Sequence, residues 1–207
     1  MLGFAHRGGM ADAPENSLEA FHKALAAGAT GLESDVWLSA DGTPVLHHGP
    51  PHRERRVPVS LAELFASCGT DFDLSLDLKG PGAAEATIVA ARDAGFTPAR
   101  LWLCAGRGTC ERLRLLAPEL RLVCDLTWRE ALFGVDAALH EIAAISVDAV
   151  NLRHGRWTRR MVRKTHEAGL LAFAWDVNNR LALRLAVRRE VDGIYSDHVR
   201  LLGHLPR

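Results

Sequence analysis

The sequence of 207 residues has no long hydrophobic run and no excess of charge of one sign. No apolar stretch approaches the roughly 20 residues that a membrane-spanning helix needs, so no membrane span is predicted. The first residues, MLGFAHRGG, lack the basic segment and apolar core of a secretory signal, so a cytoplasmic protein is expected. The 25 basic residues balance the 25 acidic ones, so no net field favours nucleic acid or an anionic membrane. Any charge that binds phosphate must therefore be local.

Cysteine is scarce, and nucleotide-binding motifs are absent. The four cysteines form no CxxC pair and no plausible disulfide framework. Reduced thiols are expected, and they are expected to be buried where Cys104 and Cys124 fall inside apolar runs. No GxGxxG or Walker-type loop follows a predicted strand, which argues against a nucleotide-binding sheet.

What the chain does contain is an alternation of strand-like and helical patterns along its whole length. With 48% hydrophobic residues it can bury a full core, so residues 1–207 are predicted to form a single domain. Eight strands alternating with eight helices favour the α/β class and a compact (β/α)8 TIM barrel, with a doubly wound open sheet as the alternative. The predicted strands cover Leu2–Ala5, Gly31–Trp37, Phe72–Leu78, Leu101–Cys104, Leu120–Asp125, Ala149–Leu152, Leu170–Val177 and Gly193–Ser196. The predicted helices cover Ser17–Ala27, Leu61–Ser67, Ala83–Ala94, Thr109–Ala117, Arg129–Ile142, Thr158–Ala168, Arg180–Arg189 and His198–Gly203.

A histidine and an arginine, His6 and Arg7, follow the first predicted strand. The two glycines after them allow backbone N–H groups to approach an anion. A single histidine at a strand end is more often structural, but the neighbouring guanidinium, a preferred partner of phosphate, favours a phosphate site. In a barrel of parallel strands, such groups gather at the carboxyl ends of the strands.

Carboxylates stand at the ends of the next two predicted strands. Glu33 and Asp35 are two residues apart, so they point to the same face of their strand. Two ionised carboxylates on one buried face repel each other unless a cation lies between them, and oxygen ligands of this kind suit Mg²⁺ or Ca²⁺. The alternative is a pair of strand-end carboxylates in salt bridges. Asp77 supplies a third carboxylate, with Lys79 two residues further on.

Two further positions stay open when only the residues are considered. His47 and His48 follow the extended stretch Pro44–Leu46, and alternation turns one of them toward the site without deciding which. Trp175 is either a core residue or, at a barrel mouth, a surface on which the alcohol part of a substrate stacks. The polar segment that follows His48 contains His52, which is expected to be exposed.

With these residues in place, the chain resembles the glycerophosphodiester phosphodiesterase family, whose members have a TIM-barrel fold. The matching motifs run in order from the first strand to the last. They are His6-Arg7-Gly8, Pro14-Glu15-Asn16-Ser17 with Phe21 and Ala24, Glu33–x–Asp35, Asp41-Gly42-x-Pro44-Val45 with a histidine, Asp77–x–Lys79, Trp175–x–Val177-Asn178 and Asp192-Gly193-Ile194-x-Ser196-Asp197.

The resemblance implies a role for each matching position. One divalent cation, Mg²⁺ or Ca²⁺, would be bound by Glu33, Asp35 and Asp77. The general acid and base would be His6 and His48, because aligning Pro44-Val45 on the family pattern selects His48 rather than His47. The phosphate and substrate would be held by Arg7, Lys79 and Trp175, with Glu15 and Asn16 supporting the site from behind.

The chain departs from the family pattern in three ways. Gly49 follows the second histidine where the family usually has aspartate, so the partner that orients that imidazole is missing or comes from elsewhere. The third carboxylate is Asp77, where glutamate is commoner. The insertion that follows the second histidine is shortened to the loop Gly49–Val59, which predicts a wider mouth.

The activity that the resemblance implies is metal-dependent hydrolysis of a small-molecule glycerophosphodiester to glycerol 3-phosphate and an alcohol. The nucleophile would be water or the 2-hydroxyl of the substrate, and no organic cofactor is needed. One alternative is a lysophospholipase D-type activity on lipid phosphodiesters, and another is a catalytically silent barrel that binds phosphodiesters. No nucleic-acid partner is expected, and nothing in the sequence specifies an oligomeric state.

Overall fold

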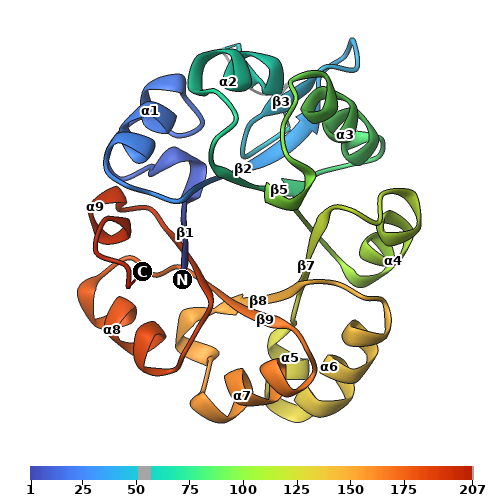
Figure 1. Cartoon of the computed structure of the whole chain (residues 1–207), viewed down its shortest axis with the longest axis vertical. Helices are drawn as coiled ribbons and strands as arrows, with labels where there is room; N and C mark the ends of the chain where they lie inside the picture. The colour runs from blue at the N-terminus through green and yellow to red at the C-terminus, as the bar shows by residue number, and fades with distance from the viewer. Residues whose placement is uncertain (51–56, 207) are drawn as a thin grey trace.

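The strands of the chain form one closed barrel. The computed structural model describes residues 1–50 and 57–206, and it shows a ring of strands surrounded by helices (Figure 1). The ring closes because β1 (Leu2–Ala5) pairs in parallel with both β2 (Gly31–Leu38) and β10 (Gly193–Ser196). The predicted (β/α)8 TIM barrel is confirmed, and the open-sheet alternative is excluded because an open sheet would leave two unpaired edges. The other ring strands are β5 (Asp73–Leu78), β6 (Leu101–Ala105), β7 (Arg121–Asp125), β8 (Ala149–Arg153) and β9 (Leu171–Trp175).

The helices lie outside the ring, and several of them start at a capping side chain. Ser60 accepts a hydrogen bond from the backbone N–H of Glu63, and the Glu63 side chain accepts from the backbone N–H of Ser60, which forms a capping box. The α-helices are α1 (Leu18–Ala26), α2 (Leu61–Cys68), α3 (Ala83–Asp93), α4 (Arg107–Leu116), α5 (Trp128–Phe133), α6 (Val135–Ala144), α7 (Arg159–Glu167), α8 (Arg180–Arg188) and α9 (Val199–Leu202). Short 3-10 turns are η1 (His6–Gly8), η3 (Pro98–Arg100) and η4 (His154–Arg156). No helix in the described ranges is long and apolar enough to cross a membrane.

The interior of the barrel is filled by aromatic rings. Phe4, Trp102, Phe173 and Tyr195 come from four different strands and pack against one another, which they can do only inside the ring. The rings of Phe4 and Tyr195 stack with their centroids 5.0 Å apart. Gly31 makes room for this packing, because a Cβ there would lie 2.6 Å from the ring of Phe4. The interior of the barrel is therefore packed with side chains, and a cavity can form only at its mouth.

Two details differ from the sequence-based expectation. The helix predicted over Arg129–Ile142 is two helices, α5 and α6, because the backbone of Gly134 (φ −159°, ψ 35°) leaves the helical region. The segment after β2 also adds two short antiparallel strands, β3 (Pro44–Leu46) and β4 (Val59–Ser60), at the edge of β2. The predicted loop Gly49–Val59 falls partly outside the described residues, and His52 lies within the part that is not described.

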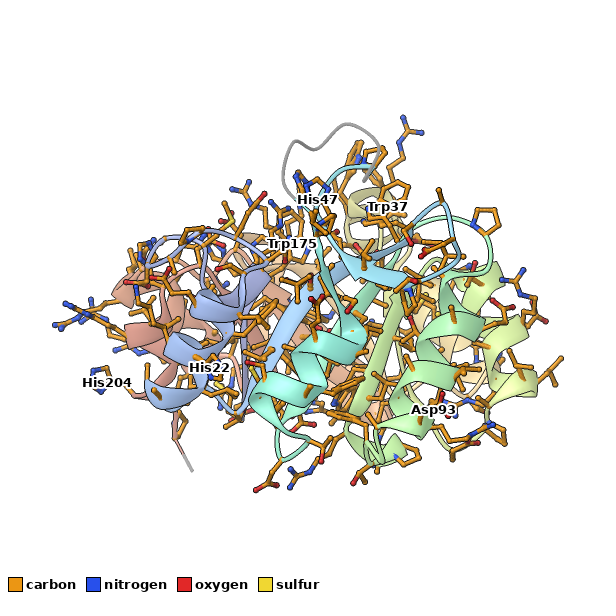
Figure 2. The ribbon with its side chains drawn as sticks, turned by 90° about the horizontal axis from the view of Figure 1, so that it is seen from above. His22, Trp37, His47, Asp93, Trp175 and His204 are labelled. Atoms are coloured by element: carbon orange, nitrogen blue, oxygen red, sulfur yellow. The ribbon has the colours of Figure 1, made fainter. Side chains whose placement is uncertain are left out.

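The carboxyl ends of the parallel strands share one end of the barrel, and this end carries the predicted functional residues. In Figure 2, Trp175 and His47 lie at this end, whereas Asp93 and His204 lie toward the other. The register of β2 against β5 sets Glu33 beside Ser75 and Asp35 beside Asp77. The carboxylates at the ends of these two strands are thereby brought side by side.

Candidate active site

A cavity of about 560 Å³ opens at the carboxyl ends of the barrel strands. Its size suits a small-molecule ligand. All the residues predicted to act as acid or base, to bind metal or to hold substrate line this cavity, although they are far apart in the sequence. They are His6, Arg7, Glu33, Asp35, His48, Asp77, Lys79 and Trp175.

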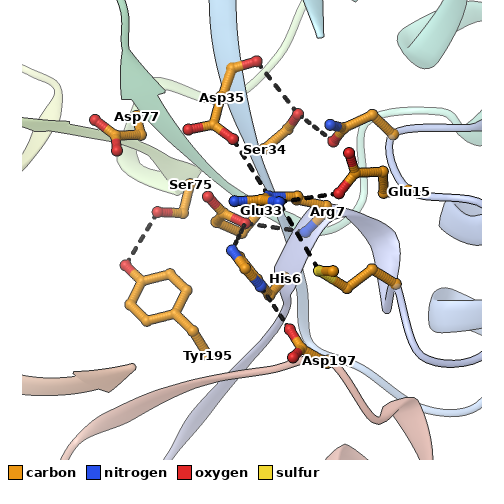
Figure 3. Close-up of polar contacts among 12 residues, drawn as sticks. His6, Arg7, Glu15, Glu33, Ser34, Asp35, Ser75, Asp77, Tyr195 and Asp197 are labelled. Atoms are coloured by element: carbon orange, nitrogen blue, oxygen red, sulfur yellow. Dashed lines mark hydrogen bonds and ion pairs between the residues drawn. The ribbon is translucent and has the colours of Figure 1, made fainter. Parts of the chain in front are cut away.

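The imidazole of His6 is held between two carboxylates (Figure 3). Its Nδ1 lies 2.5 Å from Oδ1 of Asp197, and its Nε2 lies 3.8 Å from Oε2 of Glu33. An ionised carboxylate can only accept a hydrogen bond, so the contact with Asp197 favours a proton on Nδ1. This tautomer leaves the Nε2 lone pair facing the cavity, where it can accept a proton.

Asp197 is itself fixed by Asn178, and sequence analysis gave neither residue a role. The Asn178 side-chain amide donates to Oδ2 of Asp197 at 2.7 Å, and its carbonyl accepts from the backbone N–H of Asp197 at 2.8 Å. Both residues belong to motifs shared with the family, and both follow the ends of strands. Their role follows from closure of the ring, which no sequence motif shows and which sets the end of β10 beside the end of β1.

Arg7 lies at the base of the cavity in a left-handed backbone conformation, with φ of 50°. Its backbone N–H donates to Oε2 of Glu33 at 3.0 Å, and its guanidinium donates to Glu15 at 2.9 Å. Its Nε lies 3.4 Å from Oδ2 of Asp35 but is buried without a hydrogen bond. Arg7 is thus held by carboxylates on two sides, Glu15 and Asp35.

Burial and mutual repulsion shape the protonation of the carboxylates. Burial raises the pKa of Glu33 to about 7, and the charges of Asp35 and Asp77 add to this rise, while His6 and the Arg7 N–H oppose it. Burial also raises the pKa of Asp77, against the opposing effect of Lys79. Burial and the neighbouring carboxylates therefore both favour the protonated form of Glu33.

Lys79 bridges two of these carboxylates. Its Nζ lies 2.6 Å from Oδ2 of Asp77 and 3.2 Å from Oδ1 of Asp35. Burial lowers the pKa of Lys79, but the hydrogen bond to Asp77 and the charges of Asp77 and Asp35 outweigh burial, and the net pKa is raised. Lys79 therefore enters the cavity as a cation.

The carboxylates fit a hard divalent cation in the kind of ligand they offer. Oδ2 of Asp35 is buried and, although it is ion-paired with Nε of Arg7, it accepts no hydrogen bond within the described residues, so it is an oxygen whose bonding capacity is unmet. Glu33, Asp35 and Asp77 offer only oxygen ligands, which suits Mg²⁺ or Ca²⁺. As the side chains stand, no three potential ligands among the described residues are close enough together to form a metal site.

The two adjacent histidines take different positions. His48 is exposed and lines the cavity, and it makes no hydrogen bond within the described part of the chain. His47 is half-buried, and its Nδ1 lies 2.5 Å from the carbonyl oxygen of Gly49 and 3.1 Å from its nitrogen. The structure thus sets His48 at the cavity and His47 in the loop. Gly49 provides no side chain to orient either imidazole.

Trp175 is 44% exposed and lines the cavity, so it is not a core residue. The guanidinium of Arg153 lies over its ring, 5.9 Å from the centroid. Of the two supporting residues, Glu15 bonds to Arg7, and Asn16 is buried with its carbonyl accepting from Ser34 Oγ at 2.7 Å. Neither supporting residue lines the cavity.

The far wall of the cavity carries residues that sequence analysis missed. Asp125, at the end of β7, has its pKa raised to about 6 by burial and by the charge of Asp77. Asn151, at 3.4 Å from Asp125, lies on the neighbouring strand. The signal in the sequence was an aspartate closing a predicted strand, but no spacing motif accompanied it.

Comparison with known proteins identifies relatives along the whole chain. The sequence profile of the "Glycerophosphoryl diester phosphodiesterase family" matches residues 6–80 and 82–201. A "Glycerophosphodiester phosphodiesterase" from Caldanaerobacter subterraneus subsp. tengcongensis is 24% identical over all of this chain and 98% of its own length. The "Glycerophosphodiester phosphodiesterase 1" of Homo sapiens is 57% identical over 44 residues, which is 21% of this chain and 13% of that protein.

Solved structures show the same fold. A protein described as a putative glycerophosphodiester phosphodiesterase from Galdieria sulphuraria superposes with a TM-score of 0.84 at 20% identity, covering 97% of this chain and 95% of that one. An Oleispira antarctica phosphodiesterase, solved with the product sn-glycerol-3-phosphate, superposes with a TM-score of 0.82 at 20% identity, covering 98% and 95%. At these identities the likeness establishes the fold.

Proposed function

Because the chain belongs to the glycerophosphoryl diester phosphodiesterase family, we propose that it hydrolyses glycerophosphodiesters to glycerol 3-phosphate and an alcohol. The observation that carries this proposal is the arrangement around His6. Its imidazole is fixed by Asp197 at 2.5 Å, with Nε2 turned into a cavity that also contains Arg7 and His48. A positioned base, a second histidine and a buried guanidinium are what phosphodiester cleavage requires.

The two histidines divide the proton transfers. His6, with its proton on Nδ1, takes a proton at Nε2 from the attacking oxygen as that oxygen bonds to phosphorus. The bond from phosphorus to the alcohol oxygen then breaks, and His48 gives a proton to this leaving oxygen. Each transfer typically contributes about 10²–10⁴ in rate. The attacking oxygen is that of water or of the substrate's own 2-hydroxyl, which would give a cyclic phosphate first.

The phosphate is held by basic groups that are already fixed. Arg7 offers a guanidinium held by Glu15 and paired with Asp35, and Lys79 offers an ammonium beside Asp35 and Asp77. Both side chains are immobilised by carboxylates before the substrate arrives, so little conformational entropy is lost on binding. Trp175 presents an exposed aromatic face to the alcohol part of the substrate.

The charge balance of the cavity supports a metal cofactor. Among the described residues, six carboxylates line it but only two permanently charged basic side chains do, and both of these are ion-paired with Asp35. A negatively charged phosphodiester would be repelled unless further positive charge were present. Glu33, Asp35 and Asp77 would hold one divalent cation, Mg²⁺ or Ca²⁺. When bound, it supplies positive charge that neutralises the phosphate oxygens in the transition state.

The direct test is the release of glycerol 3-phosphate from glycerophosphocholine by the purified protein. The assay is run after EDTA treatment and again with Mg²⁺ or Ca²⁺ restored. Product that depends on the ion supports both the reaction and the metal. Product that persists in EDTA would retain the reaction and overturn the metal requirement. If folded protein released no product with either ion, lysophospholipid substrates would be assayed next, and failure there would leave a catalytically silent phosphodiester-binding barrel.

A further inference from the structure

The short helix α5 lies at the mouth of the cavity. It begins at Trp128, two residues after Leu126, which lines the cavity. Arg107, the first residue of α4 after β6, pairs with Glu130 of this helix at 2.5 Å. Arg156, which follows β8, has its guanidinium 5.9 Å from the Trp128 ring centroid. All these contacts come from segments that follow the carboxyl ends of β6, β7 and β8, so α5 belongs to the rim of the cavity.

Half of this six-residue helix consists of exposed large apolar side chains. Trp128 is 49% exposed, Leu132 is 62% exposed and Phe133 is 79% exposed. Trp128 and Leu132 are four residues apart, so they share one face of the helix. A single exposed leucine is common on any protein surface, but an exposed cluster with an indole and a phenyl ring at a cavity rim marks an interaction site.

Two unpaired arginines flank this apolar cluster. The guanidinium of Arg129 lies 5.4 Å from the Trp128 ring centroid, and that of Arg156 lies at 5.9 Å. Across the described residues, neither arginine forms an ion pair, whereas the neighbouring Arg107 and Arg153 are both paired with carboxylates. The cluster therefore combines apolar tips with two positive charges that no described carboxylate neutralises.

We propose that the α5 patch, defined as Trp128, Arg129, Leu132, Phe133 and Arg156, docks the cavity mouth onto an anionic lipid surface. In this arrangement Leu132 and Phe133 enter the boundary with the acyl chains, and the indole lies at the level of the headgroups. The two guanidiniums contact lipid phosphates. The contact is peripheral, since the chain lies on the surface. It needs no net positive charge on the chain, which has none, because the positive charge is local to the patch.

The composition of the patch favours a lipid surface over other occupants. A second copy of the chain docking through the same patch would bring unpaired arginines against unpaired arginines, which is repulsive. An anionic bilayer offers both parts of the required complement, apolar depth and a layer of phosphates, without any specific shape. The other possible occupant is an acidic protein, and a binding assay with protein-free vesicles separates it from lipid.

Docking at this rim would deepen the proposed function, because it would bring lipid headgroups to the cavity. The delivery of headgroups as substrates rests on the proposed function, whereas the docking itself does not. A cavity mouth held against a bilayer would receive phosphodiester headgroups of lysophospholipids directly. Soluble glycerophosphodiesters would still enter from the aqueous side. The surface binding itself requires no catalysis, so it can be measured on protein that turns nothing over.

The first arm of the test is co-sedimentation with vesicles of phosphatidylcholine, with and without anionic phosphatidylglycerol. We expect binding to the anionic vesicles that weakens as salt rises, because salt screens exposed charge. The double variants Leu132→Ser with Phe133→Ser, and Arg129→Gln with Arg156→Gln, should each lower the partition coefficient about tenfold or more. The matched controls are Leu181→Ser with Val187→Ser, and Arg184→Gln with Arg188→Gln, all on exposed positions of α8. They should bind as wild type does.

The second arm separates failure of docking from failure of the proposed function. His6→Ala should bind vesicles as wild type does while losing turnover, and the Leu132→Ser, Phe133→Ser variant should hydrolyse glycerophosphocholine at the wild-type rate. Absence of binding to anionic vesicles, or equal losses in patch and control variants, would overturn the docking proposal. So would a dimer, or a complex with a soluble acidic peptide, that the patch variants abolish while vesicle binding is unaffected. Vesicle binding without any turnover would retain docking and remove the proposed function.

Discussion

Asp197 Oδ1 lies 2.5 Å from Nδ1 of His6, although 191 positions separate the two residues in the sequence. The contact exists because the last strand of the barrel pairs with the first, which places their carboxyl ends together. Asp197 is in turn held by two hydrogen bonds with Asn178. This chain of contacts fixes the orientation of His6 and so turns Nε2 to the cavity, and it favours the tautomer that leaves the lone pair of Nε2 free.

Replacing Asp197 with asparagine should therefore lower turnover by about 10²–10⁴ while leaving the fold intact. The amide can donate to Nδ1, which would shift the imidazole proton to Nε2 and remove the lone pair that accepts a proton. The measurement is kcat for glycerol 3-phosphate release, with circular dichroism and the melting temperature as controls for folding. A drop of less than threefold would show that Asp197 does not set the tautomer of His6.

Much of this site follows from the sequence because local rules decide it. The spacing of Glu33 and Asp35 puts both on one face of a strand whatever the fold, and strand ends collect polar groups in any parallel barrel. The contact between Asp197 and His6 did not follow, because it depends on closure of the ring, to which no local pattern corresponds. Asp125 was missed for a related reason, since its only signal was its place at a strand end.

The helices show the same division between local and tertiary control. The capping box of Ser60 and Glu63 is decided within four residues, and the spacing of the two residues alone indicates it. The predicted helix over Arg129–Ile142 was wrong at Gly134, where the chain turns from α5 into α6. A glycine lowers helix propensity by only about 1 kcal/mol, so propensity alone did not locate the break. That break is what gives the cavity rim a separate helix with an exposed apolar face.

The stability of the metal-free protein should fall as pH rises from about 5 to 8. The pKa of Glu33 is about 7 in the folded state, against an ordinary value of 4.5. A raised carboxyl pKa means that the folded state binds the proton more tightly, so the contribution is full below pH 4.5 and is lost as pH passes through 7. This shift corresponds to at most about 3 kcal/mol. Glu33→Gln should remove the decline, as followed by urea unfolding in EDTA. An identical decline in wild type and variant would contradict the assignment.

Divalent cations should raise the melting temperature, and more at pH 8 than at pH 5.5. Ligation requires ionised carboxylates, and Glu33 is protonated at the lower pH. At a cation concentration about 100 times Kd, the gain in stability is about 2.7 kcal/mol. Thermal unfolding with Mg²⁺ or Ca²⁺ is the measurement, and Asp35→Asn should abolish the gain. Asp176→Asn is the matched control, because Asp176 lines the same cavity but pairs with Arg153. Equal loss in both variants would mean that the ion binds nonspecifically.

Gly31→Ala should destabilise the protein by about 1–3 kcal/mol, because overpacking of a filled core strains it. A Cβ at Gly31 would lie 2.6 Å from the Phe4 ring and 2.7 Å from the carbonyl oxygen of Asp73. Gly106 is the matched control, since a Cβ there meets nothing within 4 Å. Denaturant midpoints of the two variants give the comparison. Equal stability would show that the aromatic core of the barrel can shift to accept a methyl group.

His48→Ala should lower turnover of glycerophosphocholine by about 10²–10⁴, whereas His47→Ala should change it less than tenfold. His48 lines the cavity, and His47 is occupied with the backbone of Gly49.

If His48 protonates the leaving alcohol, a substrate whose leaving group needs no protonation should restore activity. Glycerophospho-p-nitrophenol is such a substrate, and it should be cleaved by His48→Ala at close to the wild-type rate. The same substrate should not rescue His6→Ala, because the base is still required to form the bond to phosphorus. Rescue of His6→Ala instead would exchange the two roles, and a large loss in His47→Ala would move the acid to that residue.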